Sequence, residues 1–294
     1  MDNKNIATFI KVVEFNNFTK AAEDLGYSQT AVTAQIKTLE KELGVLLFDR
    51  IGKRICLTQE GKAFLPYAYN MLKAEEEARN SVKNDGELHG ELRICSGSSY
   101  AMGVLPGIIL KFKEIHPNVN VIVKISDYPE DTTQKLARGE IDFLVCMDEE
   151  TAYPEFLTVS KKREPVIFVT HPDNPLLDKK NIGLAEIVSN QYITSDRDIG
   201  YCALLEKELR KQGIETEPVI EMGSPGAIIN MLLEGYGISY IPKFMAEEYI
   251  KCGQLAEIYV EGIDINMHSY YLCSRHRWMN PIMKEFIWVV EEKG

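Results

Sequence analysis

The opening of the chain has the hydrophobic spacing of an amphipathic helix. Up to about residue 16, apolar residues recur at intervals of three and four: Ile6, Phe9, Ile10 and Val13. A second short helical segment, FTKAAEDL, stops at Gly26, and a third opens at Ser28, a good helix N-cap, and runs to Gly44. Because a very short glycine-containing turn joins the second and third segments, the pattern predicts a helix-turn-helix.

The third helix separates into two faces when its residues are placed at about 100° intervals. One sector is apolar, with Val32, Ile36, Leu39 and Leu43. The adjoining sector holds Gln29, Thr30, Thr33, Ala34, Lys37 and Lys41, and Ser28 at the helix start joins this DNA-facing set. In a DNA groove, Gln pairs with adenine, Thr contacts base edges and Lys neutralises phosphate. An ordinary solvated helix face is the alternative interpretation.

The segment after this helix predicts a small β-hairpin. VLLFDRIGKRICLTQEG contains two short apolar stretches on either side of a turn at Gly52. Arg50, Lys53 and Arg54 crowd the tip of this wing. Cations on a hairpin beside a groove-reading helix form a phosphate clamp, so DNA binding is expected to weaken steeply with salt.

A long helical pattern follows from Thr58 to about Asp85. Its apolar stripe, spaced by threes and fours, consists of Phe64, Ala68, Met71, Ala78 and Val82. The stripe predicts a dimerisation seam, with a helix packed on its own domain as the alternative. Pro66 predicts either a kink or a late helix start.

Beyond Gly86 strands alternate with helices, which is typical of an α/β fold with a parallel sheet. The expected strands are ELRIC, VNVIVKI, IDFLVCM, EPVIFVT, QYITS, EPVIEM, GISYIP and SYYLCSR, and the helix PIMKEFIWVVEE closes the chain. In such a sheet, ligands bind outside the carboxyl ends of the strands.

Small polar residues gather at these strand ends and form the predicted effector site. They are Ser96, Gly97, Ser98 and Ser99 after the first strand, Ser126 and Met147 at two others, Thr194 and Ser195 after QYI, and Ser224 before Pro225. Hydroxyls and free N–H groups at helix starts favour an anion, so we expect a small carboxylate or amino acid, with Arg197 as its candidate ion-pair partner. Helix capping alone is the alternative role of each residue.

Charge and composition change this picture little. The net charge is -11, but the first 60 residues hold eight basic and eight acidic side chains, so the whole acidic excess lies behind the predicted DNA-binding segment. The chain has no secretory signal pattern and no apolar run approaching the roughly 20 residues that cross a bilayer. We therefore expect a cytoplasmic protein without membrane contact.

Catalytic and metal-binding patterns are missing from the sequence. The six cysteines contain no CxxC, the five histidines have no ligand or triad spacing, and there is no GxSxG, HExxH or P-loop motif. The sequence thus predicts no enzyme activity, no catalytic residue, no metal site and no cofactor other than a small-molecule effector.

Two segments, FTKAAEDLGYSQTAVTAQIKTLEKELGVLLFDR and LTQEG, resemble the DNA-binding signature of the LysR-type transcriptional regulators. The segments GELRICSG, LARGEIDFLV and LLEGYGISYIP resemble that family's effector domain. The resemblance implies groove-reading by Gln29, Thr30 and Thr33 and backbone contacts by Lys37, Arg50 and Arg54. The family usually has Pro in place of Thr30 and a larger polar or basic residue in place of Ala34, so the operator sequence stays open.

The resemblance also implies an overall organisation. The expected fold class is α/β, with a winged helix-turn-helix over 1–58, a linker and dimerisation helix over 59–86, and an effector-binding domain over 87–294 that resembles periplasmic binding proteins. Its lobe I would comprise 91–161 and 265–294, and its lobe II 162–264.

Partners follow from the same resemblance. The family pairs subunits through the linker helix and usually forms tetramers, so we expect a homodimer or homotetramer on double-stranded DNA, with RNA polymerase as a further candidate partner. Two alternatives stay open. One is a redox-sensing regulator of the same family acting through Cys202, which opens a helix where the family's peroxide sensors keep a thiol. The other is a solute-binding protein without DNA function.

Overall fold

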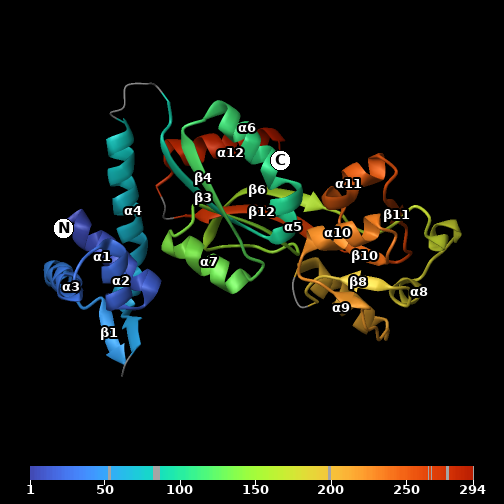
Figure 1. Ribbon diagram of the computed structural model, residues 1–294, viewed down its shortest axis with the longest axis horizontal. Coiled ribbons are helices and arrows are strands. Elements are labelled where there is room, and N and C mark those ends of the chain that lie inside the picture. Colours follow the sequence, from blue (N-terminus) through green and yellow to red (C-terminus); the bar gives the residue numbers. More distant parts are fainter. Residues whose placement is uncertain are drawn as a thin grey trace.

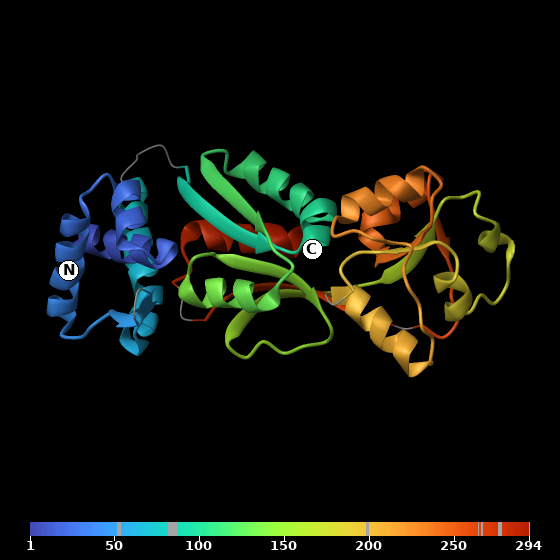
Figure 2. The same ribbon diagram turned by 60° about the horizontal axis from the view of Figure 1, so that its bottom comes forward.

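The computed structural model describes residues 1–51, 54–81, 87–197, 200–263, 265, 267–275 and 278–293. These residues form three bodies in a row, as Figures 1 and 2 show: a mainly helical N-terminal body, a middle body and an outer body. The middle and outer bodies are each built on a five-stranded sheet, and we call them lobe I and lobe II. The chain returns to lobe I for its last helix.

The N-terminal body is the predicted winged helix-turn-helix. Its elements are α1 (Asn3–Phe15), α2 (Phe18–Leu25), α3 (Gln29–Leu43), β1 (Phe48–Ile51) and β2 (Arg54–Leu57). Local signals fix the helix ends, since the Ser28 hydroxyl accepts the Ala31 N–H at 3.2 Å and Gly26 and Gly44 end α2 and α3 in the left-handed conformation. The two strands pair in antiparallel register, with Phe48 opposite Leu57.

The long helix α4 (Gln59–Ser81) is partly a member of this body. Its Leu65 and Ala68 are fully buried in the core of the N-terminal body, and the Phe64 ring lies 5.3 Å from that of Phe9. Phe64 and Ala68, which the sequence pattern placed on a dimer seam, therefore cover their own domain. The helix begins at Gln59, so Pro66 lies inside it and does not mark a late start.

Lobe I is a sheet covered by helices on both faces (Figure 1). Its strands in spatial order are β4 (Val119–Ile125), β3 (Gly90–Ser96), β5 (Phe143–Asp148), β12 (Met267–Ser274) and β6 (Phe156–Glu164). The helices α5 (Ser98–Gly103), α6 (Leu105–Ile115) and α12 (Pro281–Lys293) pack on one face, and α7 (Pro129–Arg138) packs on the other.

Lobe II repeats this architecture with shorter strands. The spatial order is β11 (Ala256–Ile258), β7 (Val166–Thr170), β10 (Ile238–Pro242), β8 (Tyr192–Thr194) and β9 (Ile220–Glu221). One face carries the 3-10 turn η1 (Pro175–Asp178), α8 (Leu184–Val188) and α9 (Gly200–Lys211), and the other carries α10 (Pro225–Leu233) and α11 (Lys243–Lys251).

The sheets are mixed, whereas the sequence pattern suggested parallel ones. The strands β3, β4 and β5 are parallel, as are β8, β9 and β10, but β12 runs antiparallel to β5 and β6, and β7 antiparallel to β10 and β11. The reason is that the chain crosses between the lobes twice and re-enters lobe I from the opposite end.

The two crossings lie side by side. The strand β6 pairs with β12 as far as Glu164 opposite Met267, so it continues lobe I past the expected limit at residue 161.

Among the described helices, even α4 lacks the apolar stretch that a bilayer crossing requires.

Candidate functional site

The helix α3 has one anchored face and one open face. Val32, Ile36 and Leu39 are buried in the N-terminal body, whereas Gln29, Thr30 and Lys37 are exposed. Thr33 is half-buried, and its hydroxyl donates to the Gln29 carbonyl at 2.9 Å. The face that the sequence pattern predicted for DNA is therefore accessible, and side chains that read base edges must be.

The wing lies directly after α3 and carries the remaining predicted DNA contacts. Arg50 stands opposite Ile55 and Arg54 opposite Ile51 in the hairpin. The side chains of Arg50 and Arg54, and the whole of Lys53, lie outside the described residues. Their contacts with DNA stay a prediction.

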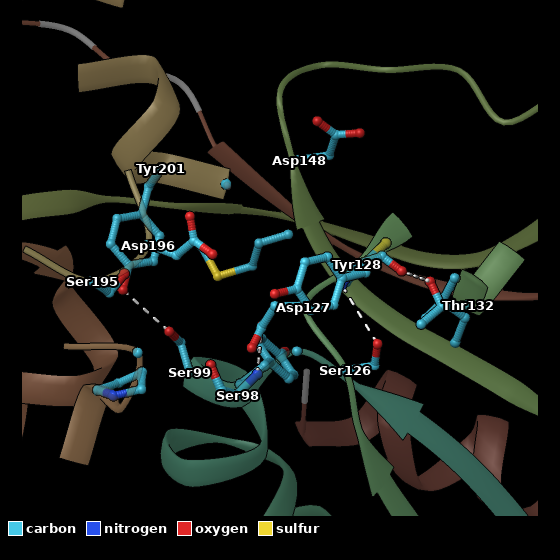
Figure 3. Close-up of a pocket in the computed structure, with 18 of the residues that line it drawn as sticks. Ser98, Ser99, Ser126, Asp127, Tyr128, Thr132, Asp148, Ser195, Asp196 and Tyr201 are labelled. Atoms are coloured by element: carbon cyan, nitrogen blue, oxygen red, sulfur yellow. Dashed lines mark hydrogen bonds between the residues drawn. The ribbon is translucent and has the colours of Figure 1, made fainter. Parts of the chain in front are cut away.

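A cavity of about 340 Å³ lies between the two lobes (Figure 3). This volume is within the range of small-molecule sites. Six of the nine predicted effector residues line it: Gly97, Ser98, Ser99, Ser126, Met147 and Ser195. Ser96 and Thr194 are buried within strand ends, and Ser224 is exposed beside the start of α10, so none of these three is part of the lining.

Both lobes supply walls of this cavity, and a hydrogen bond links the two walls. Ser99 at the start of α5 and Tyr201 at the start of α9 share a hydrogen bond of 3.3 Å between their hydroxyls (Figure 3). Burial raises the pKa of Tyr201 well above its ordinary value, so its phenol stays protonated. The cavity thus has a polar link that a change in lobe spacing would break.

The sequence pattern missed the carboxylates of the cavity. Asp127, Asp148 and Asp196 are among its described lining residues. The Asp127 Oδ1 accepts the N–H of Ser98 at 2.8 Å, and the Asp148 Oδ2 accepts the phenolic hydroxyl of Tyr153 at 2.6 Å. Each of the three directly follows a residue that was predicted, namely Ser126, Met147 and Ser195. Each lies at a strand end or two residues beyond it, and this position was the available signal.

Arg197 does not line the cavity. Its guanidinium donates to both carboxylate oxygens of Glu206, at 2.8 and 3.0 Å, and to the Thr216 carbonyl at 3.2 Å. Such a bidentate pair holds the side chain away from the interlobe space. The expected role of Arg197 toward a ligand carboxylate has no support in this geometry.

Cys202 has the environment of a structural thiol. Its side chain is 1% exposed, and the hydroxyl of Ser195 lies 3.2 Å from its sulfur. Burial raises its pKa, whereas a peroxide-reactive cysteine needs a stabilised, accessible thiolate. This environment disfavours the redox-sensing alternative.

Within the described ranges, His, Cys, Asp and Glu side chains form no group of three or more that could hold a metal ion.

A winged helix-turn-helix, joined by a long helix to two lobes that enclose a small cavity, defines a DNA-binding regulator with a ligand-sensing domain. Family models agree with this class. "LysR substrate binding domain" matches residues 85–294, and "Bacterial regulatory helix-turn-helix protein, lysR family" matches residues 4–62. The chain therefore belongs to the LysR family of DNA-binding transcriptional regulators, whose members are not enzymes.

Individual proteins show the same similarity. An uncharacterized HTH-type transcriptional regulator, YwqM of Bacillus subtilis (strain 168), is 30% identical over 287 residues, which cover 98% of this chain and 97% of that relative. ArgP from Mycobacterium tuberculosis has a similar fold, with a TM-score of 0.73, 20% identity and coverage of 100% and 97% of the two chains. Full-length CbnR complexed with its target DNA has a TM-score of 0.60, 22% identity and complete coverage of both chains.

Proposed function

We propose that this regulator reads double-stranded DNA with α3 and its wing, acts as a homodimer, and changes its DNA affinity when a small molecule occupies the interlobe cavity. The observation that carries the proposal is the orientation of α3. Its apolar face is buried in the N-terminal body while Gln29, Thr30 and Lys37 stay exposed. A helix held in this way can enter the major groove without disturbing its own core.

The predicted DNA-binding residues of α3 and the wing would divide into base contacts, phosphate contacts and a helix cap. Gln29, Thr30 and Thr33 would contact base edges, and Lys37 would contact a phosphate. The wing cations Arg50, Lys53 and Arg54 would clamp the backbone next to the groove. Ser28 acts through its cap on Ala31, which fixes the first turn of α3.

The helix α4 would join two subunits. On another side from the residues that cover the N-terminal body, it exposes a stripe at intervals of four and three residues: Tyr67, Met71, Ala74 and Ala78. Within this stripe Tyr67 is 60% exposed. Such a stripe suits a helix pair, so we keep 59–86 as the dimerisation segment between the domains 1–58 and 87–294. A homotetramer, contact with RNA polymerase and a cytoplasmic location are further parts of the proposal.

The effector would act by joining the lobes. Cavity walls come from residues as distant in sequence as Ser99 and Tyr201, so a bound molecule touches both lobes at once. A ligand that binds one lobe spacing more tightly than another shifts the population toward it. The two chain crossings between the lobes would then transmit this change in lobe spacing to the rest of the molecule.

DNA binding is the feature to test first. Fluorescence anisotropy would compare DNA from upstream of the protein's own gene with a scrambled duplex across a salt series. We expect Gln29→Ala to lower the preference for the specific duplex by about 1–3 kcal/mol. Lys37→Ala should weaken binding to both duplexes and reduce the salt slope by about 1. Lys180→Ala, an exposed lysine in lobe II, is the matched control. Unchanged binding in both α3 variants would contradict the proposed interface.

A further inference from the structure

We infer that the interlobe cavity is built for an organic cation, a molecule carrying an amine or guanidinium group, and not for an anion. The inference rests on the proposed function in one respect, that the effector occupies this cavity. It replaces the small carboxylate expected from the strand-end hydroxyls with a ligand of opposite charge.

The first argument is the charge of the lining. Asp127 and Asp148 from lobe I and Asp196 from lobe II line the cavity, and no lysine, arginine or histidine does so among the lining residues that the structure describes. Lys207 on α9, which is not among these lining residues, pairs with Glu149 at 3.6 Å. A bound anion would meet like charges in a partly desolvated space, whereas a cation would be attracted.

The second argument concerns the position where an anion was expected. The backbone N–H of Ser98, at the start of α5, donates to the Asp127 carboxylate at 2.8 Å. The Asp127 carboxylate also lies close to the backbone of Gly97. A Cβ added to Gly97 would lie 3.1 Å from the same Asp127 oxygen. The protein thus places its own carboxylate on the backbone donor that a ligand anion would otherwise use.

The third argument is the aromatic part of the lining. Tyr128, Tyr153 and Tyr201 line the cavity together with the three carboxylates, and the Tyr153 hydroxyl donates to Asp148. In Figure 3 Asp127 and Tyr128 lie on one wall, and Asp196 and Tyr201 lie across the cavity from them. Tyrosine faces attract cations, and a carboxylate on each wall can hold an ammonium or guanidinium group by charge-assisted hydrogen bonds.

A metal ion is a poor occupant of this lining. Among the described residues the carboxylates do not converge into a group of three or more that could hold a metal. Separated acids interleaved with tyrosines instead suit an extended organic cation that contacts both lobes. The cavity volume of about 340 Å³ is compatible with a small metabolite of this kind.

The test measures thermal unfolding and DNA binding of the full chain with probes of known charge. The matched probes are 1,4-diaminobutane, 1,4-butanediol and succinate, which share a four-carbon skeleton. Because the natural effector is unidentified, small-molecule extract from the source cells is also divided into fractions retained by cation exchange, retained by anion exchange, and unretained. We expect the cation-exchange fraction, and the diamine more than the diol or succinate, to raise the unfolding temperature.

Variants then tie the effect to the carboxylates. Asp148→Asn and Asp196→Asn, which keep side-chain size, should each weaken binding of the active cation about tenfold, the loss of one charge-assisted hydrogen bond. Asp173→Asn removes the charge of a side chain that is 91% exposed and lies outside the cavity lining, and it is the matched control. Two separate variants keep the test valid if one of them folds poorly.

The outcomes separate this inference from the proposed function. If the anion-exchange or unretained fraction is the active one, the ligand is not a cation and the inference is overturned, although the cavity keeps its sensing role. If the active compound still binds Gly223→Phe, whose ring would fill the cavity from a position with no atom within 4 Å of the added Cβ, the proposed site itself is wrong. If no fraction changes unfolding or DNA binding, the inference and the proposed effector role of the cavity both fail, whereas DNA reading by α3 is tested separately by its own variants.

Discussion

Glu164 is the last residue of β6, and its carboxylate is buried where the chain leaves lobe I. The Ser269 hydroxyl donates to its Oε1 at 2.8 Å. Burial raises the pKa of Glu164 above its ordinary value of 4.5, and the Ser269 hydrogen bond and the Lys162 charge offset this effect only in part. Ionised Glu164 therefore costs the native state free energy.

This residue makes stability depend on pH with a definite sign. Because the folded-state pKa is raised, its favourable contribution is complete below pH 4.5 and is lost as pH rises through the folded-state value. Glu164→Gln, which keeps the acceptor for Ser269, should stabilise the protein at pH 7.5 by on the order of 1 kcal/mol. Calorimetry at pH 7.5 and pH 4.5 would check it, since the advantage should shrink at the lower pH. An equal effect at both values would contradict this account.

Single residues also show the limit of local sequence patterns. The strand-end rule found Ser126, Met147 and Ser195, yet the acid that follows each of them decides the charge of the cavity. Hydroxyls and glycines at helix starts suggested an anion because capping and anion binding use the same backbone groups. Only the fold shows that Asp127 already occupies such a group.

Among the elements, α4 carries two different surfaces. Its first half contributes Leu65 and Ala68 to the core of the N-terminal body, and Tyr67 and Met71 project on another side. A period of three and four residues is common to both surfaces, so the sequence alone could not assign Phe64 and Ala68 to one or the other. The packing of α1 and the wing against α4 made the choice.

A charge on the exposed stripe should break the proposed dimer. We expect Met71→Glu to weaken self-association by tenfold or more, about the loss of one well-packed apolar contact at an interface centre. Analytical ultracentrifugation over a concentration series would measure it. Lys62→Glu introduces the same residue at an exposed position on the opposite side of α4 and should leave association unchanged. A Met71→Glu protein that still dimerises normally would move the seam elsewhere.

The strand β6 is an element that the sequence pattern did not predict. Its residues FLTVSKKRE end in a run of charges, so no apolar alternation marked them as a strand. They form the edge of the lobe I sheet, paired only with β12 among the described strands. Charged side chains protect an exposed edge from pairing with another chain. The same charges interrupt the apolar alternation from which a strand is predicted, so the sequence pattern did not include β6 among the expected strands.

At the scale of the whole molecule, one ion pair fastens the N-terminal body to lobe I. The Lys73 ammonium on α4 donates to Asp142, which is fully buried and whose other oxygen accepts the Arg93 N–H at 2.8 Å. Lys73 lines a cavity between the two bodies, whose walls mix apolar side chains with charged ones such as Glu14 and Glu140. The pair is thus a specific anchor in an otherwise loosely packed contact.

Breaking this anchor on one side should cost more than removing it entirely. Lys73→Met leaves the buried Asp142 charge without its ammonium partner and should destabilise the protein by about 3 kcal/mol. The double variant Lys73→Met with Asp142→Asn should recover a large part of that loss. Differential scanning calorimetry would measure both, with Lys111→Met as control, because its partner Glu292 is well exposed. Equal losses in the single and double variants would show that the charge is not the cause.

The sequence by itself determined the local parts of this regulator. Helix caps, the helix-turn-helix spacing, the wing and most strands follow from signals that act within a few residues of each other. The tertiary structure decided which face of α4 is covered, which strands run antiparallel, and which side chains surround the cavity. These depend on sheet register and on two crossings between lobes, which bring together residues about 100 positions apart, such as Ser99 and Tyr201. Short-range periodicity cannot encode such pairings, because each segment would show the same pattern whatever element packs against it.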